Sequence, residues 1–530
     1  MAITHKHIID AENDATVLAS SHAVLGLLLI ILAGLCLYFY TERRSRQKLE
    51  IATAEQYNCK PVIPFIPYKW PFALDLVYRN LSILFSDHAF ERMTPYFDMA
   101  GTCCIHMFGL TGYFTTDPRN IEAILITKFE DYCLGSRPLA NYPLFGEGIF
   151  SQDGPAWKRS RELIRHQFLR VAKQIPAAFA QPVEELVQGI KDAADDDGRV
   201  DIKPFMYDLA LSTTTELLFG EPHSSMPKED REAVRDNYDR AAFGCGIRVR
   251  LADAAWLYNP PKFRRSCKDV RAWASFFVAK AMKYKEQFGE EAATEKYAFI
   301  IELWKEMQDL ELVRDQLLHV LVAGRDSTSI LLSWMFFHLV RNPQVMRRLQ
   351  REIYASVPGE GDITREQIRK LPFLRCCLNE ILRLYPSLPL NIRFANKNTV
   401  LPRGGGPDGR SPVLLPKGTG IAFSIYHLHR LESIYGLDSR VFRPERWESG
   451  ELIKKARQVG AGFVDFNAGP RLCLGKDFAL MEASYAIIKI LQAFPNVRIA
   501  PGVPNEPVGA EKQAYTIGLS PADGVHVVLW

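Results

Sequence analysis

The sequence predicts a mainly α domain with a minor antiparallel β part, preceded by one N-terminal transmembrane helix. Segments with helical periodicity run long, whereas the strand-like runs are short. No second linker, low-complexity segment or internal repeat interrupts residues 72–530, which we therefore expect to form one large domain. The predicted helices include 155–170, 183–194, 204–219, 269–287 and 313–341, and the predicted strands are 413–415, 420–425 and 525–530.

Composition limits the classes of function. The chain has 530 residues, and 47% of them are hydrophobic, which is ample for a large core. Its 65 basic and 61 acidic residues give a net charge of +4 without a long basic block, so we expect no nucleic acid partner. The ten cysteines are scattered, with adjacent pairs at 103–104 and 376–377, and they suggest no disulfide framework. This usage fits a reducing compartment.

The amino end predicts a membrane anchor. Residues 23–40 carry no charged side chain and are long enough to cross a bilayer of roughly 30 Å as a helix. Acidic residues precede this segment and basic residues follow it at 43–48, so the positive-inside rule predicts a lumenal tail at 1–22 and a cytoplasmic main domain. A cleaved signal peptide is the alternative, but the acidic leader and the lack of a small-residue cleavage site disfavour it.

Two segments, 61–71 and 401–410, are too rich in proline or glycine for a regular helix. Residues 41–71 form a basic and proline-rich linker, whose four prolines within 61–71 predict a stiff connector. The apolar residues of this connector either touch the lipid surface or pack on the main domain. The glycine-rich stretch 401–410 lacks the Lys-Ser/Thr and the helix of a phosphate-binding loop, so we expect a hairpin turn there.

The stretch 466–475 carries the strongest chemical signal. Cys473 stands between Gly469 and Gly475, close to Arg471, and just before a predicted helix over 477–494. Backbone N–H groups and the positive end of the helix dipole favour a thiolate at such a position. No CxxC partner accompanies the cysteine, which disfavours zinc and iron–sulfur sites, whereas a single axial thiolate is one form of haem ligation. A buried, inert cysteine is the alternative interpretation.

Phe466, Gly469, Arg471, Cys473 and Gly475 match the pattern F-x-x-G-x-R-x-C-x-G, so this stretch resembles the haem-binding signature of the cytochrome P-450 monooxygenases. The resemblance implies the cytochrome P-450 fold over residues 72–530. It also implies a haem b cofactor with Cys473 as the axial ligand of the iron and with Phe466, Arg471 and Gly475 as further haem-binding residues. The implied enzyme inserts one atom of O₂ into a C–H bond, with electrons from NADPH through a separate reductase.

The predicted helix over 313–341 has a weak centre. Gly324 costs a helix about 1 kcal/mol relative to alanine, and Asp326, Ser327 and Thr328 compete for backbone hydrogen bonds. A harmless kink is one interpretation. The stretch also resembles the acid–alcohol pair in the distal helix of the family, which implies that Asp326 and a neighbouring hydroxyl deliver protons to oxygen. Because the family has threonine where this chain has Ser327, it stays open whether Ser327 or Thr328 acts.

Glu380 and Arg383 lie three residues apart on one helix face in apolar surroundings, which indicates a buried pair. They match the E-x-x-R motif of the family, and residues 442–447 resemble its P-E-R-F segment. The resemblance therefore implies a structural network of Glu380, Arg383 and Arg446.

Haem carries two propionates, which need arginines or other donors. Three sets of residues stand at positions similar to the family's: Arg471, Arg393, and the W-x-x-x-R pair Trp157 and Arg161. Each of these residues, taken alone, could instead belong to the solvated surface or the core.

The runs 323–329, 401–420, 424–436 and 466–475 resemble the fungal membrane-bound branch that hydroxylates n-alkanes and fatty acids. This implies terminal hydroxylation of such a chain by a single-pass protein of the endoplasmic reticulum membrane, with its catalytic domain in the cytoplasm. The implied partners are NADPH-cytochrome P-450 reductase, cytochrome b5, membrane lipid and a small apolar substrate. The alternatives are a P-450 that tailors a fungal secondary metabolite, a haem-thiolate isomerase or dehydratase, and a non-catalytic haem protein.

Three segments are expected to line a distal pocket, because they match the family there: 321–327, 388–390 and 517–519. An apolar wall of this kind binds an aliphatic chain at about 25 cal/mol per Å² removed from water. Arg248 and Arg250 either meet a substrate carboxylate near the entrance or belong to the solvated surface. The apolar residues of the three segments are Leu321, Val322, Ala323, Leu388, Leu390, Ile517 and Leu519.

Overall fold

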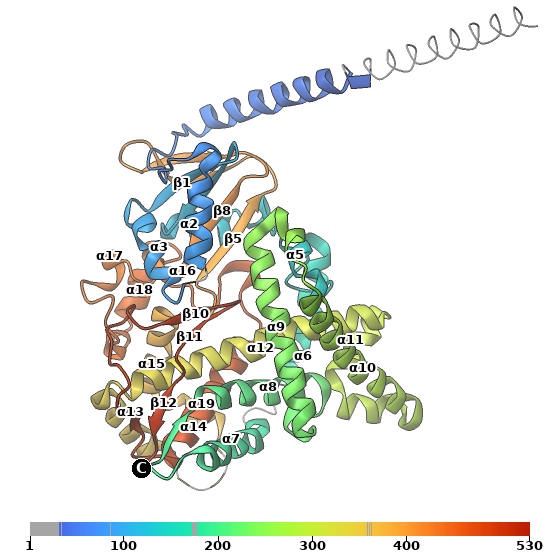
Figure 1. Cartoon of the computed structure of the whole chain (residues 1–530), viewed down its shortest axis with the longest axis vertical. Helices are drawn as coiled ribbons and strands as arrows, with labels where there is room; N and C mark the ends of the chain where they lie inside the picture. The colour runs from blue at the N-terminus through green and yellow to red at the C-terminus, as the bar shows by residue number, and fades with distance from the viewer. Residues whose placement is uncertain are drawn as a thin grey trace, which may run out of the picture.

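The computed structural model describes residues 31–32, 34–84, 86–171, 177–357, 359, 361 and 363–530. Residues 34–56 are helical, and this helix projects from the end of the body that carries β1 (Figure 1). The predicted tail 1–22 and part of the predicted anchor 23–40 lie outside the described residues. Among the helices that are described, none combines the length and the apolar character needed to span a membrane.

The predicted helices are confirmed within a few residues at each end: α6 (Gly154–Val171), α7 (Ala180–Ala193), α8 (Lys203–Phe219), α12 (Leu310–Leu339) and α19 (Lys476–Ala493). The helix expected over 269–287 is longer, because α10 (Pro261–Lys296) begins at a proline and continues past a bend at Gly289, where φ is +86°. The other helices are α2 (Leu74–Leu84), α3 (Ala89–Asp98), α4 (Pro118–Glu122), α5 (Arg137–Phe145), α9 (Lys228–Leu251), α11 (Ala298–Met307), α13 (Pro343–Ser356), α14 (Arg365–Arg369), α15 (Pro372–Leu384), α16 (Ile425–Leu428), α17 (Glu432–Tyr435) and α18 (Glu451–Gln458).

A mixed five-stranded sheet has the order β1-β2-β8-β5-β3. All its pairs are antiparallel except β2 with β8, which run parallel, with Phe114 opposite Ala422. The expectation of a purely antiparallel β part is therefore wrong at this pair, where two strands from opposite ends of the sequence meet. The strands of this sheet are β1 (Thr102–Met107), β2 (Leu110–Thr115), β3 (Tyr132–Cys133), β5 (Leu390–Ala395) and β8 (Gly420–Ser424).

Three smaller sheets complete the β part. β6 (Thr399–Gly405) and β7 (Ser411–Leu415) form an antiparallel hairpin, so the turn expected within 401–410 is confirmed, although its first half is strand. A Cβ on Gly405 would lie 2.5 Å from the Lys60 carbonyl oxygen, which explains a glycine at this point. The other strands pair as β4 (Arg199–Asp201) with β12 (His526–Val528) and β9 (Arg498–Ile499), and as β10 (Gln513–Tyr515) with β11 (Leu519–Pro521).

The proline-rich connector packs on the main domain, which is one of its two expected roles. The Ile66 N–H donates to the Cys104 carbonyl at 2.9 Å, and the Cys104 N–H donates to the Pro64 carbonyl at 3.0 Å. These bonds extend β1 by one short bridge on its free edge. Ile66 is buried, whereas Phe65 and Trp70 keep 50% and 56% of their surfaces exposed.

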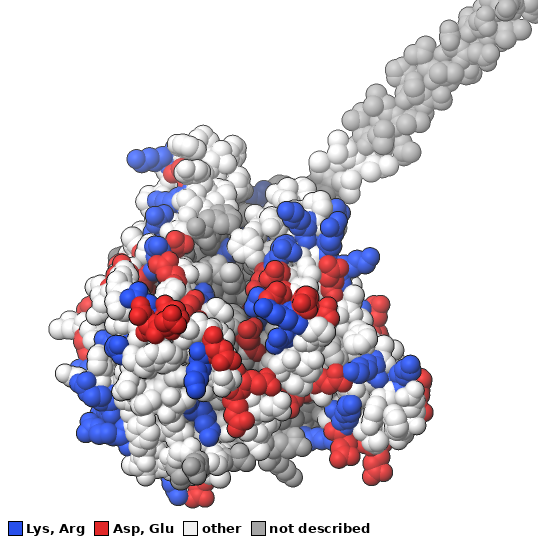
Figure 2. All heavy atoms as spheres, turned by 60° about the horizontal axis from the view of Figure 1, so that its bottom comes forward, with Lys and Arg blue, Asp and Glu red and all other residues white. Residues whose placement is uncertain are grey.

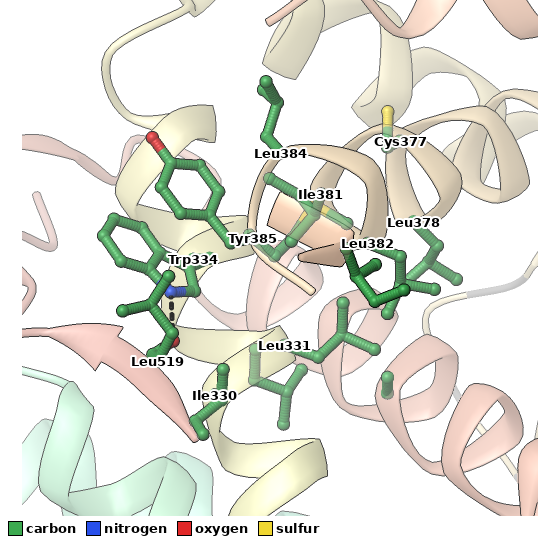
Figure 3. Close-up of a cluster of buried hydrophobic side chains, with 14 of the residues drawn as sticks. Ile330, Leu331, Trp334, Cys377, Leu378, Ile381, Leu382, Leu384, Tyr385 and Leu519 are labelled. Atoms are coloured by element: carbon green, nitrogen blue, oxygen red, sulfur yellow. Dashed lines mark hydrogen bonds between the residues drawn. The ribbon is translucent and has the colours of Figure 1, made fainter. Parts of the chain in front are cut away.

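The core surrounds α12, which packs against α8, α10, α11, α15 and α19. Its second half belongs to the buried cluster in Figure 3, where the rings of Trp334 and Tyr385 stack with centroids 3.8 Å apart. The Trp334 indole N–H donates to the Leu519 carbonyl at 2.8 Å, which fastens β11 to α12. Leu519 is fully buried in this cluster, so the expectation that it lines a distal pocket is wrong.

The surface carries charges of both signs. On the face shown in Figure 2, lysines and arginines alternate with aspartates and glutamates, and no field of a single sign dominates it. On this face, the described residues form no single-sign field of the kind that attracts a nucleic acid backbone.

Candidate functional site

The loop before α19 is built to present one thiol. The Cys473 N–H donates to the Phe466 carbonyl at 3.0 Å, which closes the loop into a tight turn. Gly469 has φ +65°, and a Cβ there would lie 2.0 Å from the Leu125 carbonyl oxygen, so only glycine fits. A Cβ on Gly475 would meet only Phe168, at an ordinary 3.6 Å, so the backbone beside Cys473 is not crowded. Cys473 itself is accessible although protein surrounds it at longer range, as for a group that faces an internal space.

Two opposing effects act on this thiol. Burial raises the pKa of Cys473, whereas the Gly475 N–H and the charges of Arg161 and Lys476 lower it. Burial outweighs the other effects, so the net direction of the pKa of Cys473 is upward. A coordinated metal cation deprotonates a thiol outright, and it would reverse this balance.

Three guanidinium groups converge near the loop: Arg393 of β5 is buried, and Arg137 of α5 and Arg471 are partly buried. Burial lowers the pKa of Arg137 to about 10, and the charge of Arg471 adds to that effect. Burial, followed by the charges of Arg137 and Arg471, lowers the pKa of Arg393 well below its usual range. Asp153 pairs with Arg471 at 2.7 Å, and the Asn391 amide oxygen accepts from Arg137 at 2.8 Å and from Arg393 at 2.9 Å.

This cluster is short of negative charge. Three cations face the single carboxylate of Asp153, and within the described part of the chain the buried Nε of Arg137 has no hydrogen-bond partner. Buried charges need partners, and two carboxylates would supply them. The two propionates of haem b fit this need. Arg137 was not predicted from the sequence, because nothing near it distinguishes it from a surface arginine before a proline.

The W-x-x-x-R pair of α6 supports the same loop. Trp157 is buried, and the Arg471 guanidinium lies 4.5 Å from its ring centre. Arg161 donates to the Leu472 carbonyl at 2.8 Å, directly beside Cys473. The structure therefore ties Arg161 to the cysteine loop and not to the guanidinium cluster.

The centre of α12 is an uninterrupted helix, contrary to the predicted weakness. Gly324 lies where α8 approaches closely, because a Cβ there would sit 2.4 Å from the Thr214 hydroxyl oxygen. The Ser327 hydroxyl donates to the Ala323 carbonyl one turn earlier, at 2.7 Å. The glycine is thus explained by packing, and the Ser327 hydroxyl is satisfied within the helix.

The two candidate hydroxyls lie in different environments. Thr328 is 1% exposed, and its hydroxyl lies against the Glu482 carboxyl of α19, which the Thr213 hydroxyl of α8 also contacts. Ser327 is only partly buried. Of the two alternatives left open, the placement favours Ser327, because it is partly exposed, whereas Thr328 is enclosed in the core.

Asp326 is paired with its neighbour. Its carboxylate accepts from Arg325 Nη1 at 3.0 Å, and 15% of its side chain is exposed. Burial raises the pKa of Asp326, while the charge of Arg325 opposes that rise.

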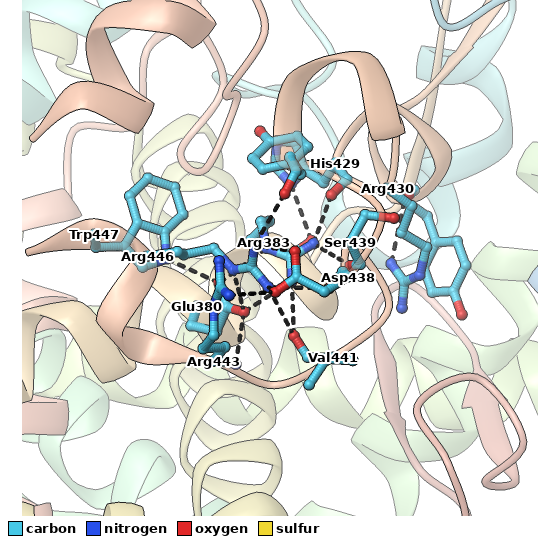
Figure 4. Close-up of polar contacts among 12 residues, drawn as sticks. Glu380, Arg383, His429, Arg430, Asp438, Ser439, Val441, Arg443, Arg446 and Trp447 are labelled. Carbon is cyan, nitrogen blue, oxygen red and sulfur yellow. Dashed lines mark hydrogen bonds and ion pairs between the residues drawn. The ribbon is translucent and has the colours of Figure 1, made fainter.

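The predicted network around Glu380 is confirmed (Figure 4). Arg383 Nη2 binds a Glu380 carboxylate oxygen at 2.8 Å, and Arg446 Nε binds it at 2.9 Å. Glu380 and Arg383 are 0% exposed, so each depends on these partners. The remaining contacts to Glu380 come from the Arg443 N–H at 2.9 Å and the Trp447 indole N–H at 2.8 Å.

Arg248 and Arg250 both donate hydrogen bonds to backbone carbonyls of neighbouring segments. Arg248 is 8% exposed, and its guanidinium donates to the Ala140 carbonyl at 2.8 Å and to the Ala255 carbonyl at 2.9 Å. Arg250 donates to the Tyr515 carbonyl at 2.8 Å and lies over that residue's ring. Both earlier interpretations of Arg248 are therefore wrong, because backbone carbonyls of the α5 and α9 region already satisfy its charge.

The profile of the cytochrome P450 family matches residues 66–519. The chain belongs to the cytochrome P450 family. It is 37% identical over 492 residues to Cytochrome P450 52A13 of Debaryomyces hansenii, which covers 89% of this chain and 92% of that protein. It is also 40% identical over 412 residues to Cytochrome P450 52A4 of Candida maltosa, covering 74% and 75% of the two chains. A cytochrome P450 of Arthroderma benhamiae is 35% identical over 496 residues, or 91% and 94% of the two chains.

Membership settles the general chemistry. This cytochrome P450 is a haem-thiolate monooxygenase, and proteins of the family receive electrons from a redox partner. The prediction drawn from residues 466–475 is confirmed at this level. The residues found at the loop fit haem, because they combine a single accessible cysteine with a cationic cluster that lacks two anions.

Proposed function

We propose that this cytochrome P450 hydroxylates a long-chain fatty acid or n-alkane at or near its terminal carbon. The observation that carries the proposal is the similarity to the 52A proteins, which extends over 92% of the length of Cytochrome P450 52A13. It adds to the resemblance of the distal helix and the cysteine loop to the fungal alkane and fatty-acid branch. The apolar side chains of Ala323, Leu390 and Ile517 keep part of their surface accessible and suit an aliphatic chain, whereas Leu321 is 1% exposed and belongs to the core.

The proposed site divides the work among named residues. Cys473 would provide the thiolate ligand of the haem iron, and Arg137, Arg393 and Arg471 would hold the propionates. Haem bound there supplies the activation of O₂ and the insertion of one oxygen atom into a C–H bond. Phe466 and Gly475 shape the loop around the thiol. Arg161 fixes this loop by donating a hydrogen bond to the Leu472 carbonyl, next to Cys473.

Residues of α12 provide the groups for proton delivery on the distal side. Asp326 is a carboxyl whose pKa burial raises, so it can take up a proton at a milder pH than an exposed aspartate can. The Ser327 hydroxyl both donates and accepts, and its present acceptor is the Ala323 carbonyl. We assign proton delivery to Asp326 and Ser327.

Membrane attachment is part of the proposal. Apolar side chains stand exposed in the segments that follow the helix over 34–56 in the sequence: Phe72 is 71% exposed, Tyr78 73% and Leu110 74%. Together with the uncharged segment 23–40, they support a single-pass protein of the endoplasmic reticulum membrane with its catalytic domain in the cytoplasm. NADPH-cytochrome P-450 reductase, cytochrome b5 and membrane lipid are its proposed partners. Deleting residues 1–56 should move most of the protein into the supernatant after a salt wash, and full retention in the pellet would place the anchor elsewhere.

Product analysis tests the substrate. The full-length protein, a fungal reductase and NADPH are incubated with a long-chain fatty acid, the matching n-alkane and a cyclic fungal metabolite. Terminal alcohol or diacid supports the proposal. Turnover of the cyclic compound with none of the linear chains would assign the enzyme to secondary metabolism instead.

A further inference from the structure

A basic pocket opens between α10, the beginning of α12 and the end of α5, and it shares no residue with the site described above. Its volume is about 410 Å³, within the range of roughly 300–1,000 Å³ that small-molecule sites occupy. Among the described residues that line it, none is acidic and four are cationic: Arg264, Lys268, Arg271 and Arg314. The lining therefore has the charge of a site for an anion.

Two helices bring these cations together. Arg264, Lys268 and Arg271 follow one another on α10 at intervals of four and three residues, so they lie on one face of that helix. Arg264 and Lys268 are exposed, whereas Arg271 is partly buried. Arg314 comes from α12, which packs against α10. The cations thus extend from the surface into the contact between the two helices.

One buried carboxylate holds the inner pair of arginines. Asp315 Oδ1 lies 2.8 Å from Arg314 Nη2 and 3.2 Å from Arg271 Nη2, and the Asp315 side chain is 8% exposed. Asp315 Oδ2 also accepts from the Glu147 N–H at 3.1 Å. Arg314 Nη2 reaches a second carboxylate, Glu311, only at 3.8 Å, and the Glu311 side chain is 81% exposed. These contacts fix the two arginines but supply only two negative charges.

The outer cations have no counterion. Within the described part of the chain, no ion pair or side-chain hydrogen bond engages Arg264 or Lys268, and the buried Nη1 of Arg271 has no hydrogen-bond partner. Four cationic side chains against two carboxylates leave a surplus of two positive charges in the cluster. Like charges held this close repel one another, and a bound dianion would remove that repulsion.

We propose that this pocket binds the phosphate group of a phosphate monoester. At neutral pH such a group carries about −1.5 to −2 charges and three strong acceptor oxygens, which matches the surplus of charge and of donors. Guanidinium groups bind phosphate oxygens in pairs, and Lys268 adds a flexible point charge. A carboxylate would neutralise only half of the surplus. The group belongs either to a soluble metabolite or to the headgroup of an anionic lipid, and both sources present the same chemistry.

Calorimetric titration of the full-length haem protein tests the proposal, at an ionic strength held constant with sodium chloride. Two probes share the phosphate monoester: glycerol phosphate, and dihexanoyl phosphatidic acid below its micellar concentration. The test variant is Arg264→Gln/Lys268→Gln. Its matched control, Lys262→Gln/Arg265→Gln, removes the same charge from exposed positions of α10 that do not line the pocket.

Wild type should bind at least one probe, and the test variant should bind it about tenfold or more weakly, because hydrogen bonds to charged groups contribute about 1.5–3 kcal/mol each. The control should stay close to wild type. Tighter binding of phosphatidic acid than of glycerol phosphate would support a lipid headgroup as the source, and equal binding a soluble phosphate.

Two results would overturn the inference: no binding of either probe to wild type at millimolar concentration, or an equal loss of affinity in the test variant and the control, since the latter means attraction to the net charge alone. All four substituted residues are exposed and lie outside the site described above, so the outcome does not depend on the proposed substrate.

Discussion

Replacing Glu380 by alanine should destabilise this cytochrome P450 more than any surface change. Glu380 is 0% exposed and binds Arg383 at 2.8 Å and Arg446 at 2.9 Å. Its removal leaves two guanidinium groups, 0% and 3% exposed, without their shared carboxylate. Breaking a buried pair costs about 3–5 kcal/mol, a large part of the roughly 5–15 kcal/mol that stabilises a typical domain. We therefore expect poor haem incorporation and an early unfolding transition.

The assay is urea unfolding with haem content measured on the same samples. The matched control is Glu451→Ala, which breaks an exposed pair with Lys454, where the side chains are 69% and 66% exposed. That change should cost about 0–1 kcal/mol. If Glu380→Ala loses no more stability than Glu451→Ala and binds a full complement of haem, the reasoning about the buried network is refuted.

From the Glu380 carboxylate we also expect a loss of stability at acid pH. Burial raises the pKa of Glu380, but Arg383 and Arg446 outweigh it, and the net direction is below its ordinary value of 4.5. A lowered pKa means that the unfolded chain takes up the proton first, so the stabilisation is complete above the unfolded value and is lost as pH falls through the folded one. Glu380→Gln should lack this part of the acid destabilisation.

Three further outcomes follow from the site. Ser327→Ala should raise the NADPH consumed per molecule of product. Thr328→Val should change stability more than the coupling of NADPH consumption to product, because Thr328 lies against Glu482. The reverse result would favour Thr328 as the proton-delivering hydroxyl. Burial raises the pKa of Glu482 from 4.5 to about 8. The free energy of unfolding should therefore fall as the pH rises between those values, because the unfolded chain loses this proton first. Glu482→Gln should flatten that fall. Arg137→Gln should weaken haem retention by about 1.5–3 kcal/mol, while Arg165→Gln on the exposed side of α6 should not.

The sequence predicted the parts whose signal is local. The periodicity of α12 and α19 and the fixed spacing around Cys473 are properties of short segments, and the structure has them within a few residues. The E-x-x-R pair was predicted because its apolar neighbours already indicated burial.

What the sequence could not show depends on distant segments meeting. Arg137 gains its role only where α5, β5 and the cysteine loop converge, and its bond to Asn391 joins residues 254 positions apart. The sequence suggested that Arg248 lies at the surface, yet its side chain is buried and its guanidinium donates to the carbonyls of Ala140 and Ala255. Leu519 matched a pocket-lining position, but the Trp334 indole binds its carbonyl and draws it into the core. In each case the neighbours across space, and not along the chain, decide the outcome.

The whole assignment of the site depends on Cys473 as the ligand of the haem iron. The most direct measurement is the absorption spectrum of the reduced protein with carbon monoxide, compared between wild type and Cys473→Ala. Wild type should show the red-shifted Soret band of a thiolate-ligated haem, and the variant should lose it while its circular dichroism remains that of a mainly helical protein. A variant that keeps the thiolate band would show that another cysteine binds the iron, and the assignment of the site would be wrong.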